Sequence, residues 1–136
     1  MADTIRLAQY FKMKAANRPG QAARALGALQ KAGVNLLAFS GFPRGGQAQL
    51  DFVVTSAASF KAAAKRAKLK VQGPKACLLI QGDDRRGAGA KLTGKLAAAK
   101  VNVTALQAIS TGGRYAAILF VKPGAVKKAA RALGAR

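Results

Sequence analysis

The side chains that carry most enzyme chemistry are nearly absent from this chain. Its 136 residues contain no His, one Cys and only four carboxylates, at Asp3, Asp51, Asp83 and Asp84. A Ser-His-Asp triad, a Cys-His pair and a four-ligand zinc site therefore cannot be assembled. Metal catalysis and ordinary acid–base catalysis are not expected either. We predict a protein that has no catalytic activity and needs no cofactor or metal.

Two short segments carry residues suited to a different task, the binding of an anion. Asn17-Arg18-Pro19-Gly20 and Asp84-Arg85-Arg86-Gly87 each precede a stretch with helical periodicity. The first turn of a helix presents unpaired backbone N–H groups and a partial positive charge, and glycine leaves room for a ligand carboxylate beside them. Arg18 and Arg85 add guanidinium groups that can hold a carboxylate through two hydrogen bonds.

Two asparagines complete the candidate ligand site. Asn35 and Asn102 each follow a predicted helix, where the next strand begins. An amide can donate to a carboxylate and accept from an ammonium group, so the combination suits an amino acid. Each feature also has a structural interpretation, because Pro-Gly is an ordinary helix start and Asn is a frequent turn residue. Asp84 can likewise be a cap or a solvated loop charge.

These segments recur because the chain contains an internal repeat of 67 residues. A shift of that length, without a gap, places Arg18-x-Gly20 on Arg85-x-Gly87, Gly27 on Gly94, Leu29 on Leu96, Val34-Asn35 on Val101-Asn102 and Gly45-Gly46 on Gly112-Gly113. Two copies are too few for a solenoid and indicate two small domains. We place the first at residues 3–73 and the second at residues 74–136.

Hydrophobic periodicity and turn residues give each copy the same order of elements. In the first copy we expect a strand from about residue 5 to 14, a helix at 19–32, strands at 34–42 and 47–55, a helix at 56–67 and a strand at 69–72. Asn17 is a possible N-cap of the first helix. In the second copy we expect strands at 75–81, 101–110 and 114–122 and helices at 87–100 and 124–133, with no room for a fourth strand. The predicted fold class is α+β, two ferredoxin-like βαββαβ modules in tandem, each an antiparallel sheet with its helices on one face.

The residues common to both copies resemble the ACT domain, a small-molecule-sensing module. Asn17-Arg18-Pro19-Gly20 and Lys31-Ala32-Gly33-Val34-Asn35 resemble that family's D-x-P-G and A-G-V-N patterns, and the second copy lacks the proline and the helix-ending glycine. The resemblance implies a regulatory domain that binds an amino acid or a similar ligand where two such domains meet side by side. The implied binding residues are Asn17, Arg18, Pro19, Gly20, Asn35, Asp84, Arg85, Gly87 and Asn102.

The high positive charge supports a competing hypothesis, nucleic-acid binding. The formal net charge is +20, and the RNA-recognition motif shares the βαββαβ order. That motif stacks bases on aromatic residues of its third strand, whereas Arg44-Gly45-Gly46-Gln47-Ala48 offers none there. The charge is also divided almost equally between the two copies. We therefore expect nonspecific contact with nucleic acid at low salt, and RNA binding stays the alternative function.

The two sheets differ on the face opposite the helices. The first is expected to carry polar residues there, whereas the second carries mainly apolar ones: Cys77, Leu79, Gln81, Ala116, Ile118 and Phe120. A strand that is hydrophobic on both sides is normally covered on both sides. We predict a homodimer formed through the sheet of the second module. A one-residue error in strand register would give the same pattern without an interface.

Cysteine usage and hydropathy predict the compartment. A lone Cys in an apolar run is typical of a buried small residue and excludes an intrachain disulfide, which fits a reducing environment. No apolar signal segment begins the sequence, and its longest apolar run is far shorter than a membrane span. We expect a cytoplasmic protein without a membrane partner.

Overall fold

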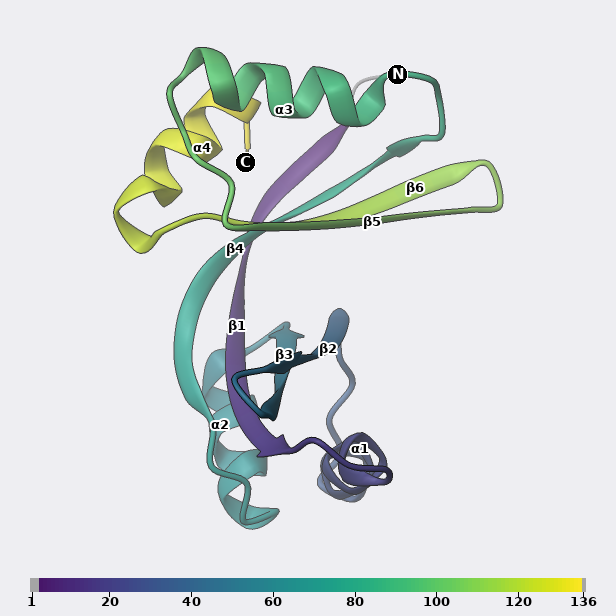
Figure 1. Ribbon diagram of the computed structural model, residues 1–136, viewed down its shortest axis with the longest axis vertical. Helices are drawn as coiled ribbons and strands as arrows, with labels where there is room; N and C mark the ends of the chain where they lie inside the picture. Colours follow the sequence, from purple (N-terminus) through teal and green to yellow (C-terminus); the bar gives the residue numbers. More distant parts are fainter. Residues whose placement is uncertain (1–2, 136) are drawn as a thin grey trace. The chain divides into compact units, whose positions relative to one another are not determined.

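The computed structural model describes residues 3–135, and its elements follow the predicted order (Figure 1). The strands are β1 (Thr4–Ala16), β2 (Ala38–Arg44), β3 (Gln47–Val54), β4 (Gln72–Asp83), β5 (Ala105–Thr111) and β6 (Arg114–Phe120). The helices are α1 (Gln21–Lys31), α2 (Ala57–Arg66), α3 (Ala88–Ala98) and α4 (Val126–Leu133), with a 3-10 turn η1 (Pro123–Ala125) before α4. The strand order is β2-β3-β1-β4-β6-β5. The predicted α+β class with antiparallel sheets is confirmed.

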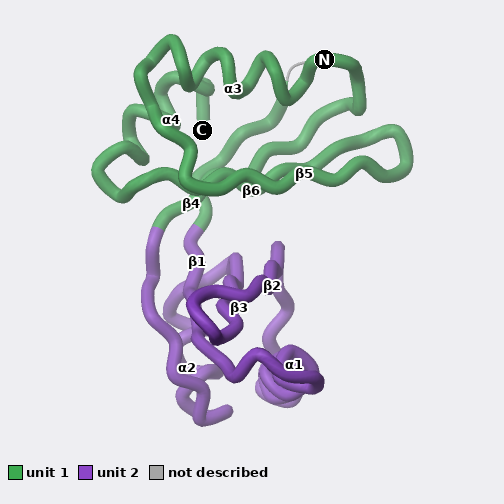
Figure 2. Tube along the Cα trace, in the orientation of Figure 1, with its two compact units in different colours: residues 1–8, 76–136 green, residues 9–75 purple. Residues whose placement is uncertain are grey.

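The chain divides into two compact units (Figure 2). Unit 2 comprises residues 9–75, and unit 1 comprises residues 1–8 together with 76–136. The long strands β1 and β4 each contribute to both units: residues 9–16 and 72–75 belong to unit 2, and residues 4–8 and 76–83 belong to unit 1. Each unit therefore contains two helices and parts of four strands.

The start of the chain lies where the second copy would need a fourth strand. As predicted, no strand follows α4 in the residues described up to 135. The N-terminal part of β1 belongs to unit 1 instead, and β1 neighbours β4 in the strand order. Ile5 is buried there among Leu78, Ile80 and Leu119. The repeat in the sequence groups residues 3–8 with the first module, whereas the structure groups them with the second.

A cluster of phenylalanines forms the core of unit 2. Phe11 of β1 pairs in register with Phe52 of β3, and both lie against Phe60 of α2. The ring centroids of Phe11 and Phe60 are 4.7 Å apart, and those of Phe52 and Phe60 are 5.6 Å apart. Ala25 and Leu29 of α1 complete the apolar layer. Offset aromatic pairs at such distances stabilise a core beyond the area that they bury.

Aliphatic residues replace the phenylalanines in the core of unit 1. Leu78 and Ile80 of β4 pair in register with Leu119 and Ala117 of β6. The two helices cover this face with Leu92 and Leu96 from α3 and Ala129 and Leu133 from α4. Both helices thus lie on one side of the strands, as the fold class requires. Cys77 is buried, as the sequence predicted.

Local sequence signals correctly located the hairpins and one helix start. The turn glycines Gly45 and Gly46 have φ angles of 57° and 80°, and Gly112 and Gly113 have 59° and 77°. Two successive residues with positive φ make the tight turn that matches strand twist, which explains why both copies use Gly-Gly. Ser56 is the N-cap of α2, where its Oγ accepts a hydrogen bond from the Ser59 N–H at 3.2 Å.

Several predicted boundaries are wrong. The segment 34–37 is a connection, and β2 begins only at Ala38. The separate strand expected at 69–72 does not exist, because β4 begins at Gln72 and continues through Gly73-Pro74 to Asp83. Position 73 requires a glycine because the β1 backbone lies close to it. A Cβ added there would be 2.9 Å from the Tyr10 carbonyl oxygen.

None of the helices that the structure describes is long and apolar enough to cross a bilayer.

Candidate functional site

Helices α1 and α3 begin in the same way, with a glycine in the N-cap position. Gly20 and Gly87 adopt left-handed conformations with φ angles of 90° and 81°. Neither helix has a capping side chain or an acidic residue in its first turn. The predicted cap Asn17 is therefore wrong, because Gly20 holds that position. Backbone N–H groups of both first turns are left without a side-chain partner, as an anion site requires.

In unit 2 this loop is open. All four residues of the loop 17–20 are exposed. The Arg18 backbone N–H donates to the Ala16 carbonyl at 3.0 Å, while its guanidinium makes no hydrogen bond or ion pair within the described chain. A Cβ added to Gly20 would meet no atom within 4 Å. An anion can therefore reach both the helix terminus and Arg18.

In unit 1 the equivalent arginine already holds a carboxylate. Arg85 donates from Nη1 to Asp3 Oδ1 at 2.9 Å and from Nη2 to Asp3 Oδ2 at 3.1 Å. Its Nη1 also donates to the Asp83 carbonyl at 3.0 Å. The hydrogen bonds from Arg85 lower the pKa of Asp3 below its ordinary 3.8. Arg85 thus makes a two-pronged contact with a carboxylate of its own chain, that of Asp3, which immediately precedes β1.

Tyr115 and Gly82 enclose the Asp3 carboxylate. Only 9% of the Asp3 side chain is exposed. A Cβ added to Gly82 would collide with Asp3 Oδ1 and lie 2.9 Å from Tyr115 Cε1. The Tyr115 hydroxyl is buried without a hydrogen-bond partner in the described residues, and burial raises the pKa of Tyr115. The Arg85 guanidinium lies 6.0 Å from the centre of the Tyr115 ring.

The two neighbouring aspartates of unit 1 have different surroundings. The Asp84 side chain is exposed and has no partner within residues 3–135, although its backbone N–H donates to the Gly113 carbonyl at 3.0 Å. Asp83 Oδ1 accepts from Arg114 Nη1 at 2.6 Å. Asp84 is thus the member of the pair whose carboxylate is available to a ligand.

The asparagines lie at the far ends of the helices from these loops. Asn35 follows the C-terminus of α1 and Asn102 that of α3, and both are exposed. Each helix has 11 residues, which corresponds to a length of about 16 Å. A single unit therefore does not bring its loop and its asparagine together around one small ligand.

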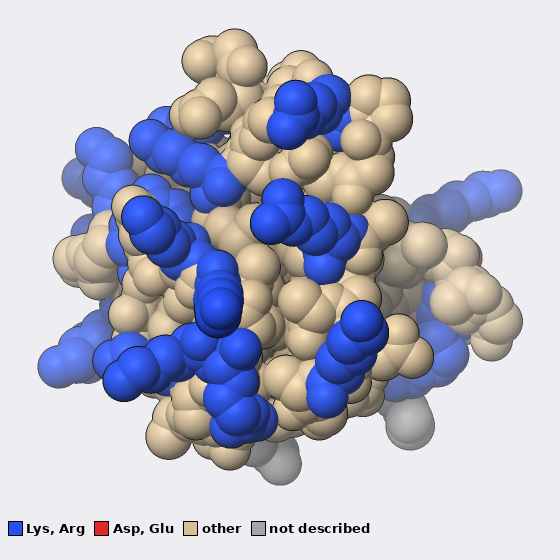
Figure 3. All heavy atoms as spheres, turned by 90° about the horizontal axis from the view of Figure 1, so that it is seen from below, with Lys and Arg blue, Asp and Glu red and all other residues tan. Residues whose placement is uncertain are grey.

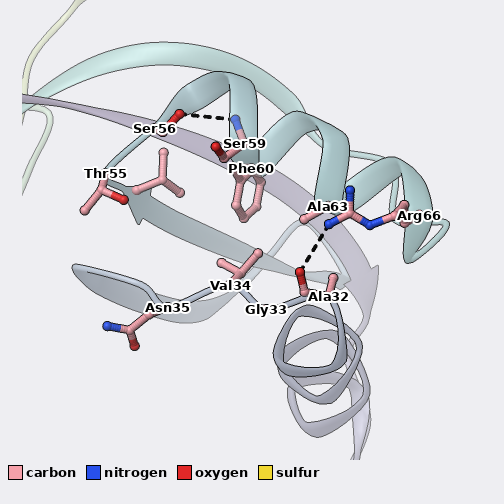
Figure 4. Close-up of a pocket in the computed structure, with 11 residues that line it drawn as sticks. Ala32, Gly33, Val34, Asn35, Thr55, Ser56, Ser59, Phe60, Ala63 and Arg66 are labelled. Carbon is pink, nitrogen blue, oxygen red and sulfur yellow. Dashed lines mark hydrogen bonds between the residues drawn. The ribbon is translucent and has the colours of Figure 1, made fainter.

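Asn35 lines a hollow between α1 and α2 in unit 2 (Figure 4). Phe60 points into the hollow, with Thr55, Ser56 and Ser59 along one side. At the other end, Arg66 Nη2 donates to the Ala32 carbonyl at 3.2 Å. The hollow measures about 150 Å³, below the order of 300 Å³ from which ligand pockets start. It does not enclose a ligand by itself.

Asp3 and Arg66 are among the polar residues of these sites that sequence reasoning missed. The repeat offers a signal for Asp3, because its equivalent 67 positions later is Lys70, a reversal of charge. No comparable signal marks Arg66, which lies in a helix rich in Ala and Lys. Within residues 3–135, no cluster of Cys and Asp side chains could hold a metal ion.

Solved structures share this fold over nearly the whole chain. A protein from Bacteroides thetaiotaomicron superposes with a TM-score of 0.81 at 18% identity, covering 96% of this chain and 88% of that one. The ligand-free regulatory subunit of aspartate kinase from Thermus thermophilus gives 0.69 at 20% identity, covering 98% and 95%. A putative C-terminal regulatory domain of aspartate kinase from Porphyromonas gingivalis gives 0.61 at 12% identity, covering 97% and 94%.

No protein-family model and no curated protein matches the sequence. The likeness therefore lies in three-dimensional structure, at identities that establish the fold alone. The chain has the fold of the aspartate kinase regulatory domains, which is of the α+β class.

Proposed function

We propose that this protein is a non-catalytic regulatory protein that senses an amino acid or a similar small carboxylate. Its fold is that of domains described as regulatory in aspartate kinases, and it carries no set of residues for acid–base or metal catalysis. The observation that carries the proposal is the open loop of unit 2, where the exposed, unpaired Arg18 and Gly20, with free space beside it, immediately precede an uncapped helix terminus. Such a terminus favours a carboxylate.

The far position of the asparagines supports a site shared between two modules. In unit 1, Asn102 precedes the edge strand β5, and the turn at the end of that strand contacts Asp84 through the Gly113 carbonyl. Antiparallel pairing of two β5 strands would place the start of one beside the end of the other. Asn102 of one copy would then approach the loop 84–87 of a second copy.

The same relation holds in unit 2. Asn35 precedes the edge strand β2, and the loop 17–20 follows Ala16, which pairs with Gln47 directly after the β2-β3 turn. A copy paired along β2 would thus bring an asparagine to the loop of unit 2, as a copy paired along β5 would do for unit 1. A ligand held between two copies would bind the assembled form more tightly than the separate chains. Ligand binding would therefore shift the equilibrium toward the assembled form.

A homodimer through the sheet of unit 1 is part of the proposal. On the face away from α3 and α4, Leu79 and Ile118 are half-buried and Ala116 is exposed. Ile109 of β5 is 66% exposed. Every residue of β5 is exposed, and within the described residues this strand pairs only with β6. An apolar face beside an open strand edge fits association with another copy.

Nucleic-acid binding is not supported as the function. Figure 3 shows Lys and Arg over much of one face of the molecule, which fits the nonspecific contact expected of a strongly basic protein. The central strand β3 presents Gln49, Asp51 and Val53 on the face where RNA-binding modules carry aromatic residues. Asp51 is also a buried carboxylate, hydrogen-bonded at 3.0 Å by Gln49 Nε2, and a negative charge opposes a phosphate ligand.

The test is a thermal-shift panel of the common amino acids at millimolar concentration, followed by calorimetric titration of any that bind. At 100 times its Kd a ligand stabilises the folded state by about 2.7 kcal/mol, a shift of several degrees for a protein of this size. We expect at least one amino acid to raise the Tm.

Variants locate the binding. Replacing Arg18 with Ala should weaken binding by roughly tenfold, the loss of about 1.4 kcal/mol. Arg131→Ala is the matched control, because Arg131 is an exposed arginine of α4 in the other unit, and its removal should leave the affinity unchanged. If no amino acid raises the Tm, or if both variants behave alike, the proposed site is wrong.

A further inference from the structure

Asp3 contacts Arg85 in the way that a bound carboxylate ligand would. Both carboxylate oxygens accept from the guanidinium, at 2.9 and 3.1 Å, and the side chain is nine-tenths buried. Lys91, in the first turn of α3, also contributes its charge to Asp3. The carboxylate therefore lies in the positive environment at the start of α3. The equivalent position in unit 2, at the start of α1, is the open loop 17–20.

The repeat shows what unit 2 has at the same positions. Residues 67 positions from Asp3, Arg85 and Tyr115 are Lys70, Arg18 and Ala48. The arginine is retained, but the carboxylate is replaced by a cation and the enclosing aromatic ring by a methyl group. Lys70 is exposed, and like Arg18 it makes no hydrogen bond or ion pair in the described chain. Arg85 is therefore neutralised by Asp3, whereas Arg18 has no carboxylate partner and Lys70 adds a positive charge in place of Asp3.

We propose that Asp3 occupies, within its own chain, the place that a ligand carboxylate takes at Arg18, so that each chain offers one anion-binding loop instead of two. Asp3 is tethered through β1, so its local concentration at Arg85 far exceeds that of a millimolar free ligand. A free carboxylate would have to displace it and leave the Asp3 charge in an enclosed site, which is costly. Unit 1 is thus closed to ligand, and unit 2 is the sensing unit.

The inference depends on the proposed function only for the identity of the ligand, so its test uses acetate, the simplest carboxylate. Nitrogen-15 spectra report each arginine Nε–H separately, with Arg18 and Arg85 assigned through Arg→Lys variants. On titration with sodium acetate we expect the Arg18 signal of the wild-type protein to shift, while the Arg85 signal responds at least roughly tenfold more weakly. Arg131, on the exposed surface of α4, reports the response of an ordinary exposed arginine.

Two variants exchange the roles of the two loops. Asp3→Asn should make Arg85 respond to acetate as Arg18 does in the wild type. Lys70→Asp should give Arg18 an intrachain partner and suppress its response. Lys61→Asp, on the exposed surface of α2, is the control for the same change of charge. Lys70→Asp removes no native contact, so it keeps the test valid if Asp3→Asn destabilises unit 1.

The outcomes separate the two proposals. If the Arg85 signal of the wild type responds to acetate as strongly as the Arg18 signal, the proposed role of Asp3 is wrong. It is also wrong if Lys70→Asp and Lys61→Asp reduce the Arg18 response to acetate equally. If acetate behaves as expected but no amino acid binds, the Asp3 assignment stands and the proposed function fails.

Discussion

At the scale of single residues, the chain contains one arginine that is paired and one that is free in equivalent positions. Arg18 and Arg85 coincide under the repeat, so sequence alone gives them the same role. Their surroundings differ because Asp3 reaches only Arg85. Whether a guanidinium can bind a ligand thus depends on a partner that lies 82 positions away in the chain.

The pairing of Asp3 predicts an acid-sensitive stability. Its folded pKa lies below the ordinary 3.8, so the unfolded chain binds the proton more readily. The free energy of unfolding is therefore expected to fall as the pH decreases through and below about 4, and the contribution is fully present at neutral pH. Urea unfolding between pH 2.5 and 7 measures the effect.

Two variants isolate this contribution. Asp3→Asn should flatten the acid limb of the stability curve, because the titrating partner of Arg85 is gone. Asp84→Asn should leave the limb unchanged, since the Asp84 carboxylate has no partner in the described structure. An acid limb that persists in Asp3→Asn would show that another group governs it.

At the scale of elements, glycines serve two different purposes. Gly82 lies in β4 against Asp3 and Tyr115, with no room for a Cβ. Gly27 in α1 and Gly94 in α3 are equivalent under the repeat, and a Cβ at either would meet nothing within 4 Å. The first glycine is required by packing, whereas the other two only weaken their helices.

Alanine substitutions at Gly82 and at the two helix glycines should therefore change the free energy of unfolding in opposite directions. Gly82→Ala is expected to destabilise the protein by about 1–3 kcal/mol, because an extra methyl group must displace the Asp3 carboxylate or the Tyr115 ring. Gly27→Ala and Gly94→Ala should each stabilise it by roughly 0.5–1 kcal/mol, since alanine is the better helix former. Chemical denaturation measures all three. A neutral Gly82→Ala would contradict the described geometry around Asp3.

At the scale of the whole molecule, the first residues of the chain belong to the unit formed by its last 61 residues. Strand β1 starts in unit 1, where Ile5 is only 6% exposed, and continues into the core of unit 2 with Phe11. Leu7, which alternates along β1 with the same period as Ile5 and Phe11, is 50% exposed.

Removing residues 2–8 should therefore destabilise unit 1 and spare unit 2. The deletion takes Ile5 from the core and Asp3 from Arg85, and the loss of a buried Ile side chain alone costs about 2–5 kcal/mol. Hydrogen exchange should show lost protection in residues 76–133 and retained protection in residues 9–66. Ile5→Ala should reproduce part of the effect, whereas Leu7→Ala should cost less than about 1 kcal/mol. Loss of protection mainly in residues 9–66 would contradict the assignment of the units.

The apolar face of unit 1 predicts a dimer. Light scattering coupled to size exclusion should give a mass twice the 14.0 kDa of the chain. Ile109→Lys should shift the protein to the monomer, because a charge would then lie in the apolar interface. Ser110→Lys places the same charge on the other face of β5 and serves as the control. A strict monomer at high concentration would exclude this interface.

The sequence alone determined the features that depend on neighbouring residues. The Gly-Gly turns, the Ser56 cap, the helix periodicity and the repeat itself are local patterns, so the element order and the fold class followed from them. The loops that precede α1 and α3 were also located, although Asn17 was wrongly assigned as the N-cap of α1. Local chemistry fixes such features because the groups involved lie within a few residues of one another.

Tertiary structure decided which strand completes each sheet. A repeat that ends before its eighth strand does not say what lies beside β4, because strand pairing joins segments that are distant in sequence. The structure places residues 4–8 in unit 1, and that placement carries Asp3 to Arg85 and leaves Arg18 open. Both loops have an arginine and a glycine at equivalent positions, and only the long-range pairing of β1 brings a carboxylate of the same chain to one of them.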